Sequence, residues 1–388
     1  MTVLSAPGAG QMTRWTNARL DALRQVGDPD IDPLVRAAYD EGGPAALGRI
    51  TRQLDDWEAP LPDDLPAGLR NYFATPVVYP SWVDQSQLRH AEDLFASFGP
   101  LTLSTLLLSS YPQFLTCPAG AQAMYRARAF SPESVASRML ELAQFSIFMG
   151  ERHGLSIDAG HDYQRHGRSF VAYRKLRVIH ANLRLILTGP AAAKPWDTQG
   201  LGVVVNQEDL ALAMLCFSVS TIDGLQKTGF DLSAADQEAM LMGWRTAGWL
   251  LGLSDELQPR DFQEATLLRD LILARHQRAT PEAAVVVREM LHVVEGLLPL
   301  GTRQVPAALV RFQVGPRVAE LLDLPNPKLL LGLLHVTQPL WKTTRLFARL
   351  SKLISPRLLR WASAPNRLGG TRRFTIPAKL AARMGSER

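Results

Sequence analysis

The sequence has few cysteines and no long apolar run. Its 388 residues include two cysteines, Cys117 and Cys216, which form neither a Cys-x-x-Cys pair nor the Cys-x-x-Cys-His sequence that attaches c-type haem. Two such cysteines fit buried thiols in a reducing compartment. No stretch of about 18 uncharged apolar residues is present, so no transmembrane helix is expected. The first ten residues also lack the features of a secretory signal, and we expect a cytoplasmic protein.

A strong excess of one charge is also missing. The chain has 42 lysines and arginines against 37 aspartates and glutamates, and 46% of its residues are hydrophobic, enough for a large core in one or two domains. The basic excess gathers near the C-terminus, in 341–352 and 357–388. No aromatic platform or docking motif accompanies it, so we expect no nucleic-acid partner. It suits a solvated surface, or peripheral contact with anionic membrane lipid.

Several catalytic signatures are absent as well. The sequence has no Gly-x-Ser-x-Gly, His-Glu-x-x-His or Walker motif and no dinucleotide fingerprint. Alternating strand patterns are scarce, whereas helical periodicity continues along the chain. We therefore predict an all-α protein built as a single large helical domain. Helix starts are expected at Asp84 or Ser86, at Asn206 and at Ser233, where a side-chain oxygen can cap the first turn. Separate helices are expected over 85–98 and 101–108.

The stretch Arg177-Val-Ile-His180-Ala-Asn-Leu-Arg184 carries most information. At about 100° per residue, its histidine and two arginines fall within roughly 60° of one helix face. An apolar sector lies beside this arc, and the remaining side, with Arg174, Lys175 and Asn182, is expected to face water. His180 would then lie at the border of the core, where a helix can line a pocket. On helix geometry alone, a histidine at the edge of an amphipathic helix explains the pattern equally.

Other segments strengthen this stretch by their order. They are Pro80-Ser-Trp82-Val-Asp84, Leu107-Leu-Ser-Ser-Tyr111-Pro112, Asn206-Gln-Glu-Asp209 with Phe217-Ser218, Trp244-Arg-Thr-Ala-Gly248-Trp-Leu-Leu-Gly252, and Arg311-Phe-Gln-Val-Gly315. In this order, from about Trp82 to Leu324, the chain resembles the latex-clearing-protein group of oxygenases, which also contains the fungal mycophenolic-acid-pathway oxygenase. Each segment alone is a weak signal, and the Arg-x-x-His-x-x-x-Arg element is the strongest of them.

The resemblance implies a fold, a cofactor and a division of the chain. Members bind one b-type haem in an all-helical, globin-like core. This implies a haem-binding, oxygenase-like catalytic domain over residues 67–330. An N-terminal helical extension and linker would occupy 1–66, and a basic C-terminal helical extension would occupy 331–388.

The same resemblance implies site residues. His180 matches the axial iron ligand of the family, and Arg177 and Arg184 match arginines that support the haem site, for which we expect pairing with the propionates. Arg311 best matches a further downstream arginine, with Arg317 as the alternative.

One element departs from the rubber-cleaving members of the group. Those members carry Arg-x-x-Lys-Thr one helix before the ligand histidine, whereas this chain has Arg138-Met-Leu-Glu141-Leu142. Arg138 and Glu141 remain candidate catalytic residues, the first in the distal pocket and the second as an acid or base. The loss of the lysine and threonine argues against rubber as the substrate. The missing export signal argues the same way, because a polymer particle must be attacked outside the cell.

Three hypotheses follow. The leading one is a haem-b-dependent oxidoreductase that uses O₂ or a peroxide on an apolar substrate, such as an isoprenoid, lipid or aldehyde chain. The second is a haem-binding sensor or carrier without turnover. The third is a haem-free helical scaffold whose basic tail binds a partner or a membrane.

Overall fold

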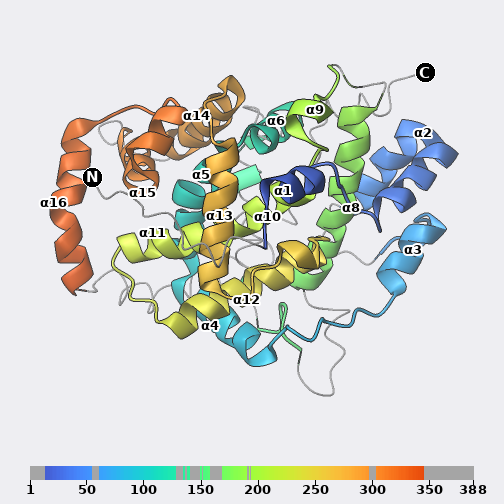
Figure 1. Cartoon of the computed structure of the whole chain (residues 1–388), viewed down its shortest axis with the longest axis horizontal. Coiled ribbons are helices and arrows are strands. Elements are labelled where there is room, and N and C mark those ends of the chain that lie inside the picture. The colour runs from blue at the N-terminus through green and yellow to red at the C-terminus, as the bar shows by residue number, and fades with distance from the viewer. Residues whose placement is uncertain are drawn as a thin grey trace.

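The computed structural model describes residues 14–54, 61–127, 134–135, 138–139, 149–150, 152–157, 168–189, 192, 194–296 and 303–344. Every regular element among them is helical, which confirms the all-α prediction. The main hydrophobic core collects side chains from Leu20 to Leu324, so these helices form one domain around a shared interior (Figure 1). The boundaries expected at 66 and 330 stay predictions. No helix in these ranges is long and apolar enough to cross a membrane.

The elements follow one another along the chain with short connections. The first group comprises α1 (Asn17–Leu23), α2 (Asp32–Leu54), α3 (Ala67–Ala74), α4 (Gln85–Thr105), α5 (Tyr111–Leu115), α6 (Pro118–Arg126) and α8 (Arg168–Thr188). The second group comprises α9 (Thr198–Leu201), α10 (Gln207–Leu215), α11 (Thr221–Lys227), α12 (Ala234–Leu250), α13 (Phe262–His276), α14 (Pro281–Gly296), α15 (Val305–Leu321) and α16 (Lys328–Thr344). The packing is closest between α4 and α12, between α6 and α14, and between α2 and α8.

Three of the helix starts carry the side-chain caps that the sequence predicts. Asp84 Oδ1 accepts hydrogen bonds from the amides of Ser86 and Gln87. Asn206 Oδ1 accepts from the amide of Asp209, and Ser233 forms a reciprocal capping box with Asp236. These caps satisfy amides that have no partner within the helix.

The expected break between helices 85–98 and 101–108 is wrong. α4 continues through Gly99 and Pro100 to Thr105, because its packing along α12 outweighs the local Gly-Pro signal. Breaks occur elsewhere instead: Gly43 in α2 and Gly315 in α15 each have positive φ and a proline behind them. The left-handed backbone, which glycine adopts at little cost, bends both helices there.

Two widened helical turns lie face to face in the core. The π-helical turns η1 (Leu106–Ser110) and η3 (Cys216–Ser220) interrupt α4–α5 and α10–α11, and they pack against each other. Ser110 Oγ lies 2.8 Å from Thr221 Oγ1, and Ser109 Oγ donates to the carbonyl of Ser220 at 3.3 Å. Two of the resemblance segments therefore correspond to π turns, which often occur at functional sites.

α8 is buried on nearly all sides, and the expectation that Arg174, Lys175 and Asn182 face water is wrong. All three are buried. The side chains of α8 contribute to three apolar clusters, because Ile179 joins the main core, Val178 joins the cluster formed with α2, and Leu187 joins a third. A helix between several layers has no solvated face, which the sequence of α8 alone does not reveal.

Candidate functional site

His180 lies near the middle of α8 and has a neutral imidazole. Its Nδ1 atom is buried and has no hydrogen-bond partner among the described residues. Burial, and then the positive charge of Arg184, lower the pKa of His180 to about 3. Both effects disfavour the protonated ring, so the ring nitrogens keep an unprotonated lone pair at neutral pH. A neutral imidazole is the form that binds a metal.

The described residues contain no group of three or more histidine, cysteine, aspartate or glutamate side chains that could hold a bare metal ion. His180 would therefore bind iron only where another molecule supplies the remaining ligands. A porphyrin does so through four nitrogens in one plane, leaving one or two axial positions for the protein. The donor set fits that arrangement.

Arg177, one turn before His180, is engaged by the N-terminal part of the chain. Its Nε donates to Asp28 at 2.5 Å and its Nη2 to Asp30 at 2.7 Å. The pair lies directly against Gly252, whose Cα would place a Cβ within 2.5 Å of Arg177 Nε. With φ at +87°, Gly252 both ends the α12 turn and leaves room for the ion pair.

Arg184, one turn after His180, makes the equivalent contact further along. Its Nε donates to Asp32 at 2.8 Å and its Nη1 to the carbonyl of Val205 at 3.1 Å. Both arginines beside His180 thus bind carboxylates of residues 28–32. Their expected pairing with haem propionates stays a prediction, and it requires the guanidinium groups to bind further acceptors next to Asp28 and Asp32.

The two carboxylates on Arg177 offer a matched comparison. Asp28 is buried, whereas Asp30 is mostly exposed. We expect Asp28→Asn to lower the free energy of unfolding by about 3 kcal/mol, because it leaves the half-buried Arg177 charge without its buried partner. Asp30→Asn is expected to cost less than about 1 kcal/mol. Urea denaturation of both variants checks this, and equal costs would show that burial of Asp28 is not what stabilises the pair.

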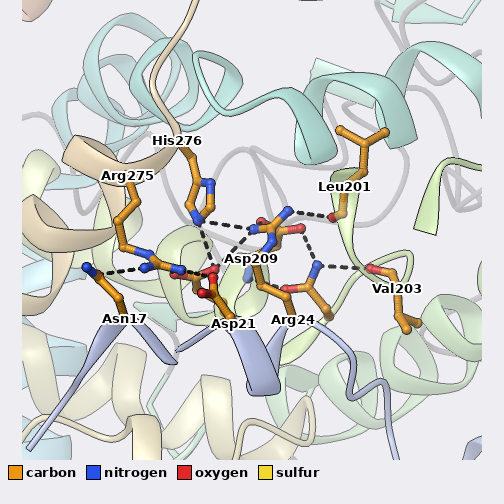
Figure 2. A network of polar contacts seen from close by, with 10 residues as sticks. Asn17, Asp21, Arg24, Leu201, Val203, Asp209, Arg275 and His276 are labelled. Carbon is orange, nitrogen blue, oxygen red and sulfur yellow. Dashed lines mark hydrogen bonds and ion pairs between the residues drawn. The ribbon is translucent and has the colours of Figure 1, made fainter. Parts of the chain in front are cut away.

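Residues 14–32, which we name the N-terminal strap, cross the ends of four helices. Arg14 binds Glu264 of α13, and Gln207 of α10 donates its side-chain amide to the carbonyl of Gly27. Arg24 binds Glu208 and Asp209 at 3.1 Å each and donates to the carbonyl of Leu201 at 2.5 Å (Figure 2). The strap therefore ties α8, α10 and α13 together.

Glu208 is the centre of this network. Its two oxygens accept from Arg275 at 3.0 Å, from Arg24 at 3.1 Å and from His276 at 2.9 Å, and its side chain is fully shielded from solvent. Burial alone would raise the pKa of Glu208, but the hydrogen bond and charge of His276, with the two arginines, lower it below its ordinary value. Burial and the neighbouring Glu208 charge raise the pKa of Asp209.

The sequence predicts only part of this cluster. The capping role of Asn206 and the acidic first turn are confirmed. The ion pairs were missed, because Arg24 and Arg275 lie 184 and 67 residues away from Glu208. The spacing of acids in a first helical turn carries no signal for such distant partners.

The remaining predicted site residues lie apart from α8. Arg138 lies near the buried Tyr111, whose pKa is raised by burial and held back by the Arg138 charge. Glu141 falls outside the described residues. Arg311 on α15 donates to the carbonyls of Leu324 and Pro325, at 2.9 and 2.7 Å, and so fixes the chain after α15. The structure thus gives Arg311 a structural contact, and its haem role stays a prediction.

A row of aromatic rings connects the π turns with α12 and α4. Tyr111 and Phe217 stack with centroids 6.1 Å apart, Phe217 lies 5.4 Å from Trp244, and Trp244 meets Phe95 edge-on at 6.1 Å. Trp244 is buried in the main core, which agrees with the expected packing role. The interior is therefore apolar and aromatic on the side of α12 that also packs against α8.

Fold and site together define an all-helical protein with one unprotonated, buried histidine in a central helix. Residues 162–362 match the family model described as the catalytic domain of ER-bound oxygenase mpaB/B'/rubber oxygenase, and the chain belongs to this family of oxygenase enzymes. It is 25% identical to the rubber oxygenase of Streptomyces sp. (strain K30) over 317 residues, which cover 81% of this chain and 75% of that protein. The matched range includes His180, whereas Arg138 and Glu141 precede it.

The solved structures support the same fold. The latex clearing protein LCP in its closed state superposes with a TM-score of 0.63 at 21% sequence identity, over 94% of this chain and 90% of that one. At this identity the superposition speaks for the architecture. It confirms the predicted all-α family fold beyond the range that the family model matches.

Proposed function

We propose that this protein is a haem-b-dependent oxygenase that uses O₂ to oxidise an apolar substrate, such as an isoprenoid, lipid or aldehyde chain. One observation carries the proposal. Within the range matched by an oxygenase family, His180 offers a neutral imidazole with a buried Nδ1 that has no partner in the described part of the chain. A buried polar atom without a partner is costly, and a bound cofactor would explain why it is kept.

The chain's own residues would hold the group and control its surroundings. Haem, when bound, supplies an iron that can bind and activate oxygen. His180 would ligate the iron on one side, and the ion pairs of Arg177 and Arg184 would fix the position of α8. The aromatic interior around Phe217 and Trp244 would keep water away. Arg138 near Tyr111, together with Glu141, are the proposed groups on the distal side, and Arg311 is a proposed outer support.

The substrate class follows from similarity. The relative from Streptomyces is named for rubber, an apolar polymer, and an apolar substrate suits the aromatic interior of this chain. Glu141 and Leu142 in place of lysine and threonine argue for a smaller apolar substrate than rubber. A cytoplasmic location belongs to the same proposal, supported by Cys117 and Cys216, which are buried and free.

Oxygen consumption tests the proposal. The purified protein, supplied with haem b, would be mixed with squalene, a long-chain unsaturated fatty acid, a long-chain aldehyde and latex particles. We expect oxygen uptake and oxidised products with at least one small apolar substrate and little with latex. A haem-loaded protein that consumes no oxygen with any of them would be a sensor or carrier instead. A protein that takes up no haem would contradict both proposals.

A further inference from the structure

α16 carries a stripe of exposed apolar side chains. Leu329, Leu333, Val336 and Leu340 are 88%, 58%, 78% and 61% exposed, and they make up half of the eight exposed large hydrophobic residues in the described chain. Single exposed apolar residues are normal on protein surfaces, but a continuous row marks an interaction site. We name these four residues the α16 stripe.

The helix holds the stripe away from the body. At about 100° per residue, the four side chains fall within roughly 60° of arc and span about 16 Å. The opposite side of α16 contacts the domain, because His335 packs edge-on against Phe312 at 5.3 Å and Gln338 donates to the carbonyl of Lys227. α16 lies at the left edge of Figure 1, across the molecule from α8.

The charge around the stripe has one sign. Lys328 begins α16 and Lys342 lies in its last turn. From 324 to the end, the chain has 13 lysines and arginines and a single carboxylate, Glu387, whereas the preceding 323 residues have 29 basic and 36 acidic side chains. The charge asymmetry of the whole sequence thus concentrates where the apolar stripe lies.

We propose that α16 docks the protein on an anionic lipid bilayer, lying in the interface with its stripe among the acyl chains and its lysines at the headgroups. Basic charge alone suits water or a lipid surface equally, and the exposed stripe decides between them. An amphipathic helix with these two faces binds at the interface without crossing it. A second copy of this chain is the weaker alternative, because stripe-to-stripe contact would bring two strongly cationic segments together.

Vesicle flotation of the full-length protein tests this docking. We expect the protein to float with vesicles of phosphatidylcholine containing about 30% phosphatidylglycerol, and to stay in solution with phosphatidylcholine alone. Binding should weaken in high salt, since screening removes the attraction to anionic lipid. The variant Leu333→Glu/Leu340→Glu should bind at least about tenfold more weakly, because it places charge in the acyl region.

Val78→Glu is the matched control, since Val78 is 82% exposed but lies outside α16. Its binding should equal that of the wild type. Equal binding by the stripe variant and the wild type would overturn the proposal, as would a lack of binding to anionic vesicles. A wild-type dimer in light scattering that Leu333→Glu/Leu340→Glu converts to a monomer would assign the stripe to a second copy instead. Haem binding and oxygen uptake play no part in these measurements, so this proposal can fail independently of the proposed function.

Discussion

His180→Ala is expected to abolish haem binding. The purified wild-type protein, supplied with haem b, should show a Soret band in its absorption spectrum, and the variant should show little or none. The reason is that the described residues place one candidate iron ligand in the buried part of α8, with no neighbouring histidine, cysteine, aspartate or glutamate group to replace it. Oxygen uptake with an apolar substrate should fall with the spectrum, by at least about a hundredfold.

Two companion variants sharpen this test. His292→Ala removes an exposed histidine from α14 and should leave the Soret band unchanged. His180→Gly leaves a space beside α8, and free imidazole added to this variant should restore part of the band, because it can occupy the ligand position. A His180→Ala protein with a wild-type spectrum would remove His180 from the site and end the proposal.

Glu208→Gln is expected to destabilise the fold by about 3–5 kcal/mol at pH 7. It removes the one carboxylate that Arg24, Arg275 and His276 share, and leaves cationic groups in a buried setting with reduced compensation. The loss should be global, because the strap connects α8, α10 and α13 through this cluster. The free energy of unfolding in urea measures it.

Asp21→Asn provides the control on the same arginine. Asp21 contacts Arg275 at 2.5 Å but is mostly exposed, so the loss should stay below about 1 kcal/mol. A cost for Glu208→Gln as small as that for Asp21→Asn would mean that the buried cluster breaks even against its desolvation. The strap would then be held by its backbone hydrogen bonds instead.

The same pair of proteins has a defined pH dependence. The pKa of Glu208 in the folded protein lies below its ordinary value of 4.5, so the carboxylate contributes stability above about pH 4.5 and loses it as the pH falls through the folded pKa. The difference in unfolding free energy between wild type and Glu208→Gln should therefore be constant from pH 7 to about 5 and shrink below 4.5. A difference that grows on acidification would show that the direction of the shift is wrong.

The all-α class, the main helix boundaries and the caps at Asp84, Asn206 and Ser233 could be predicted from the sequence. They depend on contacts within a few residues, such as hydrophobic periodicity and side-chain oxygens that satisfy free amides. The order of short segments was also enough to predict the family, which the comparisons confirm. His180 was predicted as the central residue from one helical turn on either side.

The surroundings of His180 depended on the tertiary structure. Arg177 and Arg184 are separated from Asp28 and Asp32 by about 150 residues, and the periodicity of α8 carries no information about a strap that arrives from the other end of the sequence. For the same reason Lys175 and Asn182 were expected in water, although packing on several sides buries them.

The sequence by itself determined which segments are helices and which helix carries the candidate ligand, because those properties follow from local backbone and capping energetics. Only the tertiary structure decided which charges meet, that Glu208 is buried at their centre, and that the α16 stripe is left exposed. Burial and ion pairing arise from the arrangement of distant segments, and their energies depend on surroundings that no short stretch of sequence specifies.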